Sequence, residues 1–204
     1  MKTGNQMVSE ATTKNPIKLK WRIVVDTAEN HAFSFDNIKS DAAQHGRPIQ
    51  VECVRRCLGR HPNSLGDYSL EPTEVQPTLQ TGCWCYVERK SLEDCQSTLL
   101  GFGDGHRERF ESELANLAAV IRAGGAALVV VECSLSALIG TTVTQSQKPP
   151  AVVTKSLHRS VVSCWEKYGV PWAFCDGRRM AEITTFRFLE SFWRHRKREA
   201  RVEQ

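Results

Sequence analysis

The chain has 204 residues, a hydrophobic fraction of 41%, and 27 lysines and arginines against 23 aspartates and glutamates, which gives a formal net charge of +4. A chain of this size can bury a large core without disulfide or metal cross-links, and its composition excludes collagen, a coiled coil and full disorder. No apolar run approaches the roughly 20 residues of a membrane helix, and the polar N-terminal region lacks the apolar centre of a secretory signal. The protein is therefore expected to be intracellular, in the cytoplasm of a bacterial or phage host or in a eukaryotic nucleus.

The first half of the chain is predicted to be rich in strands. Residues 1–19 are polar, carry three of the lysines and lack periodicity, so we expect a disordered basic tail before a domain that spans residues 20–193. A long connection that carries Pro72, Pro77 and Gly82 is predicted to join the last two strands of this half as an extended hairpin or loop. The expected strands are Trp21–Asp26, Ile49–Val54, Tyr68–Leu70 and Trp84–Val87.

After Lys90 the apolar spacing changes to that of helices alternating with strands. Phe110, Leu114, Leu117 and Ile121, for example, recur at helical spacing. Such alternation predicts an α/β domain with a mixed central β-sheet flanked by helices, and residues 194–204 are expected to form a basic helix end or tail. The expected elements are a helix from Ser91 to about Leu100, one through Phe110–Ile121, a strand at Ala126–Val131, a helix through Leu157–Tyr168, a strand at Pro171–Cys175 and a last helix after Asp176.

The eight cysteines do not form paired Cys-x-x-Cys knuckles of the kind that bind zinc. Several of them end apolar runs, as Cys133 and Cys175 do, and no secretory signal precedes them. We therefore expect reduced and mostly buried thiols.

Charged residues that suit hydrolysis are concentrated between Gly66 and Asp94. Side chains alternate along a strand, so Glu88 and Lys90 are predicted to share one face and Arg89 to lie on the other. If the segment that starts at Asp67 pairs with this strand, Asp67 lies beside Glu88. Two carboxylates and an ammonium would then meet at one end of the sheet.

This triplet suits the hydrolysis of a phosphodiester. Two carboxylates can bind Mg²⁺ or Mn²⁺ through oxygen and leave positions for water and phosphate. Such a cation lowers the pKa of its bound water, and Lys90 can orient that water or stabilise the transition state. Arg89 is expected to make a structural ion pair or to reach a phosphate from the side. The alternative is an ordinary sheet edge with solvated Glu and Lys.

Gly66-Asp67, a variable spacer and Glu88-Arg89-Lys90-x-x-x-Asp94 resemble the signature of the XPF-type nuclease family, a branch of the restriction-endonuclease-like PD-(D/E)XK superfamily. Val25-Asp26-Thr27-Ala28-Glu29 is similar to the first strand of that family. Arg109-Phe110-x-x-Glu113-Leu114 is similar to its following helix, and Ala127–Glu132 to its next core strand. The resemblance covers roughly residues 22–193.

The resemblance implies a metal-dependent DNA endonuclease, with structure-specific cleavage as one form of that activity. Asp67 and Glu88 would bind the metal, with Glu29 as a direct or water-mediated ligand, and Lys90 would be the catalytic lysine. Arg89 would be required for full activity and Asp26 would complete the acidic cluster, whereas we expect Asp94 to hold the turn at the helix start. The family also implies a homodimer formed through the nuclease domain.

The chain departs from the family pattern at two places. Ala28 stands where the family usually has Arg, so a positive group near the scissile phosphate is missing. The spacer between Asp67 and Glu88 is also about ten residues longer than is typical. Apart from these two departures, we expect a compact form of the family without its helix-hairpin-helix module. A catalytically inactive DNA-binding relative and an unrelated α/β protein are the alternatives.

Basic residues outside the triplet are the candidates for contact with the DNA backbone. Arg107 and Arg109 precede the predicted helix through Phe110, and five lysines or arginines stand among residues 194–204. Surface ion pairs or a solvated helix end are the alternatives for these residues. The predicted DNA-binding residues are Arg107, Arg109, Arg194, Arg196, Lys197 and Arg198.

Overall fold

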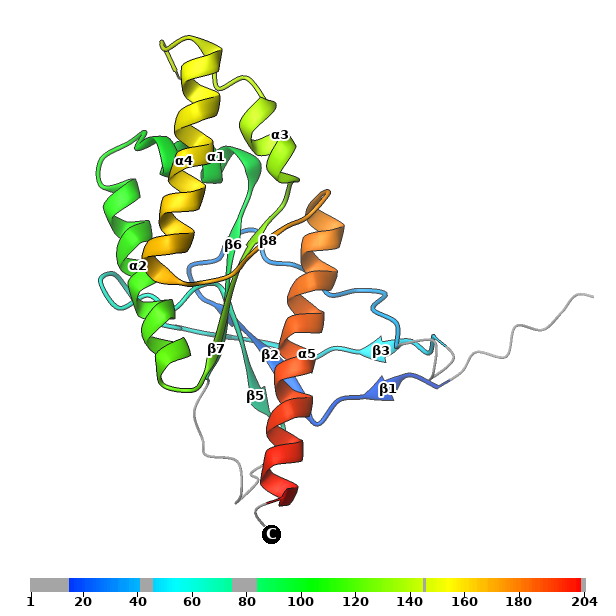
Figure 1. Ribbon diagram of the computed structural model, residues 1–204. Helices are drawn as coiled ribbons and strands as arrows, with labels where there is room; N and C mark the ends of the chain where they lie inside the picture. The colour runs from blue at the N-terminus through cyan, green and yellow to red at the C-terminus, as the bar shows by residue number, and fades with distance from the viewer. Residues whose placement is uncertain (1–14, 41–45, 75–83, 145, 203–204) are drawn as a thin grey trace, which may run out of the picture.

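A computed structural model describes residues 15–40, 46–74, 84–144 and 146–202, with only the backbone described for residues 199–202. Its centre is a six-stranded mixed sheet with the strand order β4-β2-β5-β6-β7-β8 (Figure 1). The chain is therefore an α/β domain with a mixed central sheet, as the sequence predicts. The strands are β2 (Trp21–Asp26), β4 (Cys53–Arg56), β5 (Tyr68–Pro72), β6 (Cys85–Lys90), β7 (Ala126–Val131) and β8 (Trp172–Phe174), and a separate pair is formed by β1 (Ile17–Lys18) and β3 (Ile49–Gln50).

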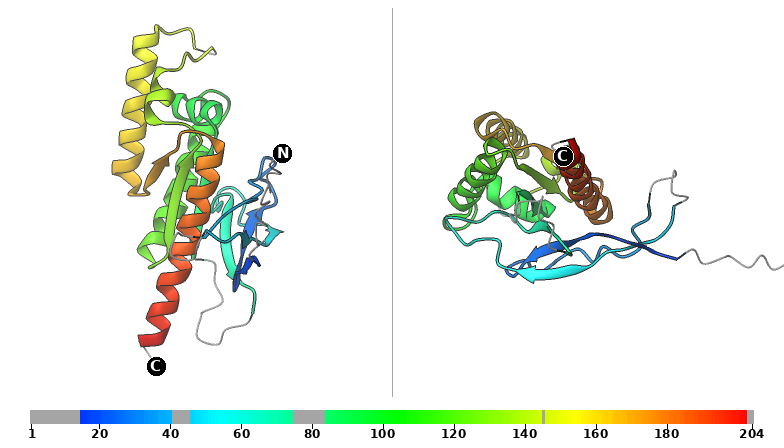
Figure 2. Two further views of the ribbon diagram at one scale, coloured as in Figure 1. Left: turned by 90° about the vertical axis from the view of Figure 1, so that its right-hand side faces the viewer. Right: turned by 90° about the horizontal axis from the view of Figure 1, so that it is seen from below.

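Helices cover both faces of this sheet (Figure 2). Alternate residues of the central strands point to opposite sides, so Tyr86 and Val129 pack with the first four helices, and Val87 and Val130 pack with the fifth. Neither face of β6 and β7 is solvated, which explains the continuous apolar run of β7. The helices are α1 (Leu92–Leu100), α2 (His106–Arg122), α3 (Leu135–Gly140), α4 (Pro150–Tyr168) and α5 (Arg178–Val202).

Most of the predicted elements are present, with corrections at the edges of the sheet. The run expected as one strand at Ile49–Val54 is divided, because Ile49 pairs in parallel with Ile17, whereas Cys53 pairs in parallel with Ile23. Residues 17–18, expected in the tail, therefore form β1, while residues 1–14 lie outside the described residues, as do residues 75–83 of the long connection.

Helix α3 was not predicted, because six residues are too few to establish an apolar period. The amide of Ala137 donates to Ser134 Oγ, which caps the start of this helix. Among the described residues, no helix is long and apolar enough to cross a membrane.

The cysteines follow the prediction where they are described. Five of the thiols are buried and free, namely Cys85, Cys95, Cys133, Cys164 and Cys175. Cys53 and Cys57 are exposed and also free.

Candidate active site

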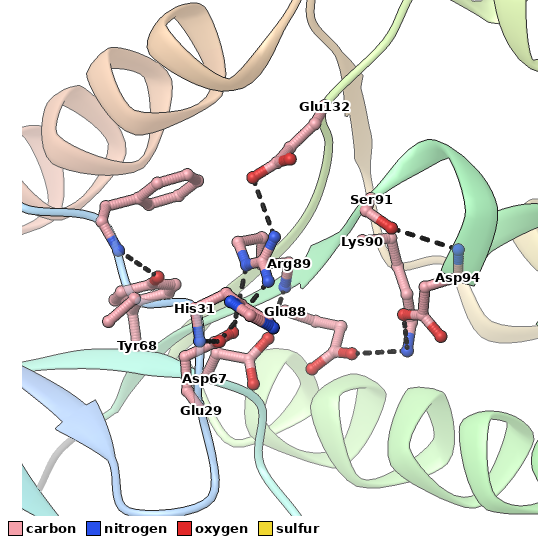
Figure 3. Close-up of polar contacts among 12 residues, drawn as sticks. Glu29, His31, Asp67, Tyr68, Glu88, Arg89, Lys90, Ser91, Asp94 and Glu132 are labelled. Atoms are coloured by element: carbon pink, nitrogen blue, oxygen red, sulfur yellow. Dashed lines mark hydrogen bonds and ion pairs between the residues drawn. The ribbon is translucent and has the colours of Figure 1, made fainter.

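The candidate active site lies where β5 begins and β6 ends. These two strands pair antiparallel with Tyr68 opposite Val87 and Ser69 opposite Tyr86, so continuing the register places Asp67 opposite Glu88. The amide of Asp67 donates to the Val87 carbonyl at 2.9 Å, and the Arg89 amide donates to Asp67 Oδ2 at 2.8 Å. The two carboxylates predicted from the sequence therefore lie side by side (Figure 3).

Gly66 allows this close approach of the two strands. Its φ is +96°, and a Cβ at this position would lie 2.9 Å from the Val87 carbonyl oxygen. A side chain would thus be strained by its backbone conformation and would also push β6 away. The glycine of the Gly-Asp motif fixes the position of Asp67 against β6.

Burial and mutual repulsion disfavour the charged forms of both carboxyl groups. Burial, together with the charge of Glu29, raises the pKa of Asp67 to about 7. Burial also raises the pKa of Glu88 well above its ordinary value, and the charges of Asp67 and Glu113 add to this effect. A cation at this position would relieve the repulsion.

Lys90 lies on the same side of β6 as Glu88, as the strand alternation predicts. Its Nζ is 2.9 Å from Glu88 Oε1 and 3.2 Å from Asp94 Oδ2, and it lies 4.8 Å from the centroid of the Phe110 ring. Burial alone would lower the pKa of Lys90, but the charges of Glu88 and Asp94 raise it, so the ammonium stays protonated. This pairing makes Lys90 a fixed positive charge beside the two carboxylates.

Asp94 lies in the first turn of α1, where we expected it to hold the turn at the helix start. Its amide donates to Ser91 Oγ, the cap of the helix, and its carboxylate pairs with Lys90. The start of α1 is thereby tied to the end of β6.

Arg89 points to the opposite side of β6 and makes two buried ion pairs. Its Nε lies 3.0 Å from Glu29 Oε2, and its Nη1 lies 2.8 Å from Glu132 Oε1 at the end of β7. The pKa of Arg89 is raised: burial opposes its charge, but the bonded carboxylates outweigh burial. Of the two predicted roles, the ion pair is the one that the structure contains.

Asp26 and Glu29 lie close to the triplet, but their oxygens already have partners. Asp26 accepts hydrogen bonds from the amides of Ala28 and Leu58, at 2.7 and 2.5 Å. Glu29 pairs with Arg89 and accepts from the amide of His31 at 2.5 Å. In this arrangement Asp26 holds the turn after β2, and Glu29 orients Arg89 instead of presenting free oxygens to a metal.

Glu113 of α2 is a site residue that was not predicted to have a role. It follows Phe110 by about one helical turn, and its Oε1 accepts a hydrogen bond from Ser64 Oγ at 2.7 Å. Its charge raises the pKa values of Asp67, Glu88 and Lys90, which places it near all three. The sequence signal for Glu113 was its helical spacing from Phe110. That spacing gains a meaning only once α2 is packed on the sheet, with Phe110 against Lys90.

The predicted DNA-binding residues divide between two regions. Arg107 and Arg109 lie in the first turn of α2, next to the Phe110 that contacts Lys90. Arg196 instead donates to the Gly124 carbonyl just before β7. Because β6 and β7 are parallel, Arg194, Arg196, Lys197 and Arg198 lie toward the end of the sheet opposite to Glu88 and Lys90.

The carboxylates suit a hard divalent cation. One oxygen of each, Asp67 Oδ1 and Glu88 Oε2, has no hydrogen-bond partner among the described residues. Within the described ranges, no group of three or more His, Cys, Asp and Glu side chains is arranged to hold a metal ion. Two protein oxygens with water and phosphate completing the shell are the usual arrangement for Mg²⁺.

Comparison with solved structures identifies the fold as XPF-type. XPF from Aeropyrum pernix matches with a TM-score of 0.50 and 15% identity, over 83% of this chain and 63% of that chain. A structure of XPF from Aeropyrum pernix in complex with DNA matches with a TM-score of 0.44 and 17% identity, over 87% of this chain and 66% of that chain. No protein-family model and no curated protein matches. The resemblance seen in the motifs is thus confirmed at the level of the fold.

Proposed function

We propose that the protein is a metal-dependent endonuclease that hydrolyses phosphodiester bonds in DNA. The observation that carries this proposal is the meeting of Asp67, Glu88 and Lys90 where β5 begins and β6 ends. A sheet edge with solvated Glu and Lys does not account for it, because Glu88 is buried and the Lys90 side chain is only 12% exposed, beside a second carboxylate. The likeness to XPF from Aeropyrum pernix supports the same reading.

Asp67 and Glu88 would hold Mg²⁺ or Mn²⁺ through their unpaired oxygens, and the bound cation would supply an activated water and offset phosphate charge. Lys90 would release Glu88 to the cation and use its protonated Nζ to stabilise charge on the phosphate in the transition state. Arg89, held by Glu29 and Glu132, fixes the end of β6 and the orientation of the Asp67 carboxylate through its amide.

A DNA-binding protein without turnover is the second candidate, and Ala28 is the observation that favours it. The Ala28 amide donates to Asp26 Oδ1 at 2.7 Å, so the turn keeps its shape but has no side chain that reaches a phosphate. Binding in this case would persist without hydrolysis.

A cleavage assay separates these candidates. Full-length protein is incubated with plasmid, single-stranded and branched DNA, with Mg²⁺, with Mn²⁺ or with chelator. We expect metal-dependent cleavage that falls by roughly 100-fold or more in Glu88→Gln and in Lys90→Ala. Glu93→Gln, which changes an exposed acid of α1, serves as the control. Metal-independent binding without cleavage of any substrate would support the second candidate.

We also propose self-association through the nuclease domain. Val162 and Trp165 stand one helical turn apart on α4 and are about half exposed, an unusual state for a tryptophan. Sedimentation velocity of the wild type and of Trp165→Glu tests this. A monomeric wild type at all concentrations would contradict it.

A further inference from the structure

Arg178, the first residue of α5, lies next to the site but was not among its predicted residues. Its Nη1 is 2.7 Å from Glu132 Oε1, the carboxylate oxygen that also lies 2.8 Å from Arg89 Nη1. One carboxylate at the end of β7 therefore holds two guanidiniums together, one from β6 and one from α5.

The two guanidiniums differ in their access to solvent. The Arg89 side chain is 10% exposed, whereas that of Arg178 is 46% exposed. Both lie against the Phe33 ring, with 5.8 Å from its centroid to Arg89 Cζ and 4.9 Å to Arg178 Cζ. The ring limits the orientations of Arg178 while nearly half of the side chain stays open to solvent.

Arg178 also has donors to spare. Its Nη1 donates to Glu132, and its Nη2 donates to the carbonyls of His31 and Ala32 at 2.5 and 2.9 Å. An arginine has five N–H bonds, so within the described part of the chain Nε–H and one N–H of Nη1 remain without a partner. Each of these N–H groups can donate to a phosphate oxygen, and the positive charge of the guanidinium strengthens such a hydrogen bond.

The charges around the site favour the same ligand. Glu88 and Asp94 share a single ammonium, that of Lys90, and Asp67 adds a third acid beside Glu88. Glu29 is already paired with Arg89. Arg178, which shares Glu132 with Arg89, is an exposed positive charge linked to this cluster through described contacts. Its place in the first turn of α5 adds the positive end of the helix dipole.

We propose that Arg178 binds a backbone phosphate of the DNA strand beside the one that is cleaved. This inference rests on the proposed DNA-cleaving function and adds to it a residue that positions the substrate. The alternative is that Arg178 only ties α5 to residues 31–32. That role predicts a loss of thermal stability when Arg178 is changed, with no change in how DNA binding depends on salt.

The test measures DNA binding in a Glu88→Gln background, which slows cleavage. Fluorescence anisotropy with a labelled duplex gives the affinity for DNA over a range of salt concentrations. Four proteins are compared: the Glu88→Gln background alone, and the same background with Arg178→Gln, with Arg178→Lys or with Arg179→Gln. Arg179 is the matched control, because it is the next residue of the same helix turn, is 48% exposed and is paired with Glu182.

We expect Arg178→Gln to weaken binding by about 5- to 20-fold and to reduce the slope of log affinity against log salt by about 0.9, the loss of one phosphate contact. Arg178→Lys should keep most of the slope, because it keeps the charge, and it also provides a test if Arg178→Gln does not fold. An unchanged slope in a folded Arg178→Gln variant, or an equal loss in Arg179→Gln, would overturn this inference and leave the proposed function standing. If neither the background protein nor the wild type binds DNA under any condition, both this inference and the proposed function are wrong.

Discussion

The carboxyl groups of Asp67 and Glu88, which lie side by side, make the stability of the metal-free protein depend on pH. The pKa of Asp67 rises from its ordinary value of 3.8 to about 7, mainly through burial, so the folded protein binds a proton there that the unfolded chain has released. The stabilisation linked to this proton is fully present below about pH 4 and is lost as the pH rises through about 7.

We therefore expect the melting temperature of metal-free protein to fall between about pH 5 and about pH 8, and Mg²⁺ to restore it at the higher pH. Thermal unfolding with Mg²⁺ and with chelator measures this. Asp67→Asn should flatten the pH dependence and abolish the response to Mg²⁺. If Mg²⁺ raised the melting temperature of the wild type equally at about pH 5 and at about pH 8, the proposed metal ligands would be wrong.

Glu113 provides a second prediction at the scale of the residue. Because its charge raises the pKa values of Asp67 and Glu88, Glu113→Gln should lower the pH at which Mg²⁺ binding is half-maximal. Calorimetric titration with Mg²⁺ across pH provides the measurement. Glu111→Gln, on the same helix but paired with Arg107 and Lys167, should leave the profile unchanged. Weaker binding at every pH would show instead that Glu113 holds the metal.

At the scale of the element, the start of β5 depends on Gly66. Gly66→Ala places a Cβ 2.9 Å from the Val87 carbonyl oxygen at a φ of +96°, so we expect a loss of about 1–3 kcal/mol in the free energy of unfolding. Because the displaced strand carries Asp67, affinity for Mg²⁺ should fall as well.

Gly101→Ala is the matched control for this change. Gly101 ends α1 with a φ of +72°, but nothing lies within 4 Å of an added Cβ. Gly101→Ala should lower the free energy of unfolding by about 1 kcal/mol, because of its backbone conformation alone, and should leave the affinity for Mg²⁺ unchanged. Chemical denaturation and calorimetry compare the two variants, and equal losses of Mg²⁺ affinity in both would exclude a special role for Gly66.

At the scale of the whole molecule, α5 connects two positively charged regions. It runs for 25 residues, and the 18 steps from Arg178 to Arg196 correspond to about 27 Å at a rise of about 1.5 Å per residue. Duplex DNA rises about 3.4 Å per base pair, so this distance equals about eight base pairs.

We accordingly expect a double change, Arg194→Glu and Arg198→Glu, to weaken binding to duplexes that extend well past eight base pairs from the cleavage position, and to flatten their salt dependence. Binding to shorter duplexes and binding of Mg²⁺ should not change, because the acidic cluster lies at the other end of the sheet. Anisotropy with a series of duplex lengths tests this. An equal effect at all lengths would indicate a general loss of charge attraction.

The triplet of Asp67, Glu88 and Lys90 was predictable from sequence because its geometry depends on neighbours along two paired strands. Alternation along β6 places Glu88 and Lys90 on one face, and the ion pair between them confirms that. Strands β2 (Trp21–Asp26) and β7 (Ala126–Val131) were predictable for a related reason, because a short continuous apolar run is typical of a strand that is buried on both faces of a sheet.

Contacts between distant segments were not predictable in this way. Three contacts join residues that no period or spacing connects: the pairing of Ile17 with Ile49, the hydrogen bond of Ser64 to Glu113, and the sharing of Glu132 by Arg89 and Arg178. The sequence by itself determined an α/β domain with two carboxylates and a lysine at the end of a strand. Only the tertiary structure decided that Glu29 is held by Arg89, that the basic end of α5 lies away from the site, and that Arg178 lies beside it, because these depend on how helices pack across the sheet.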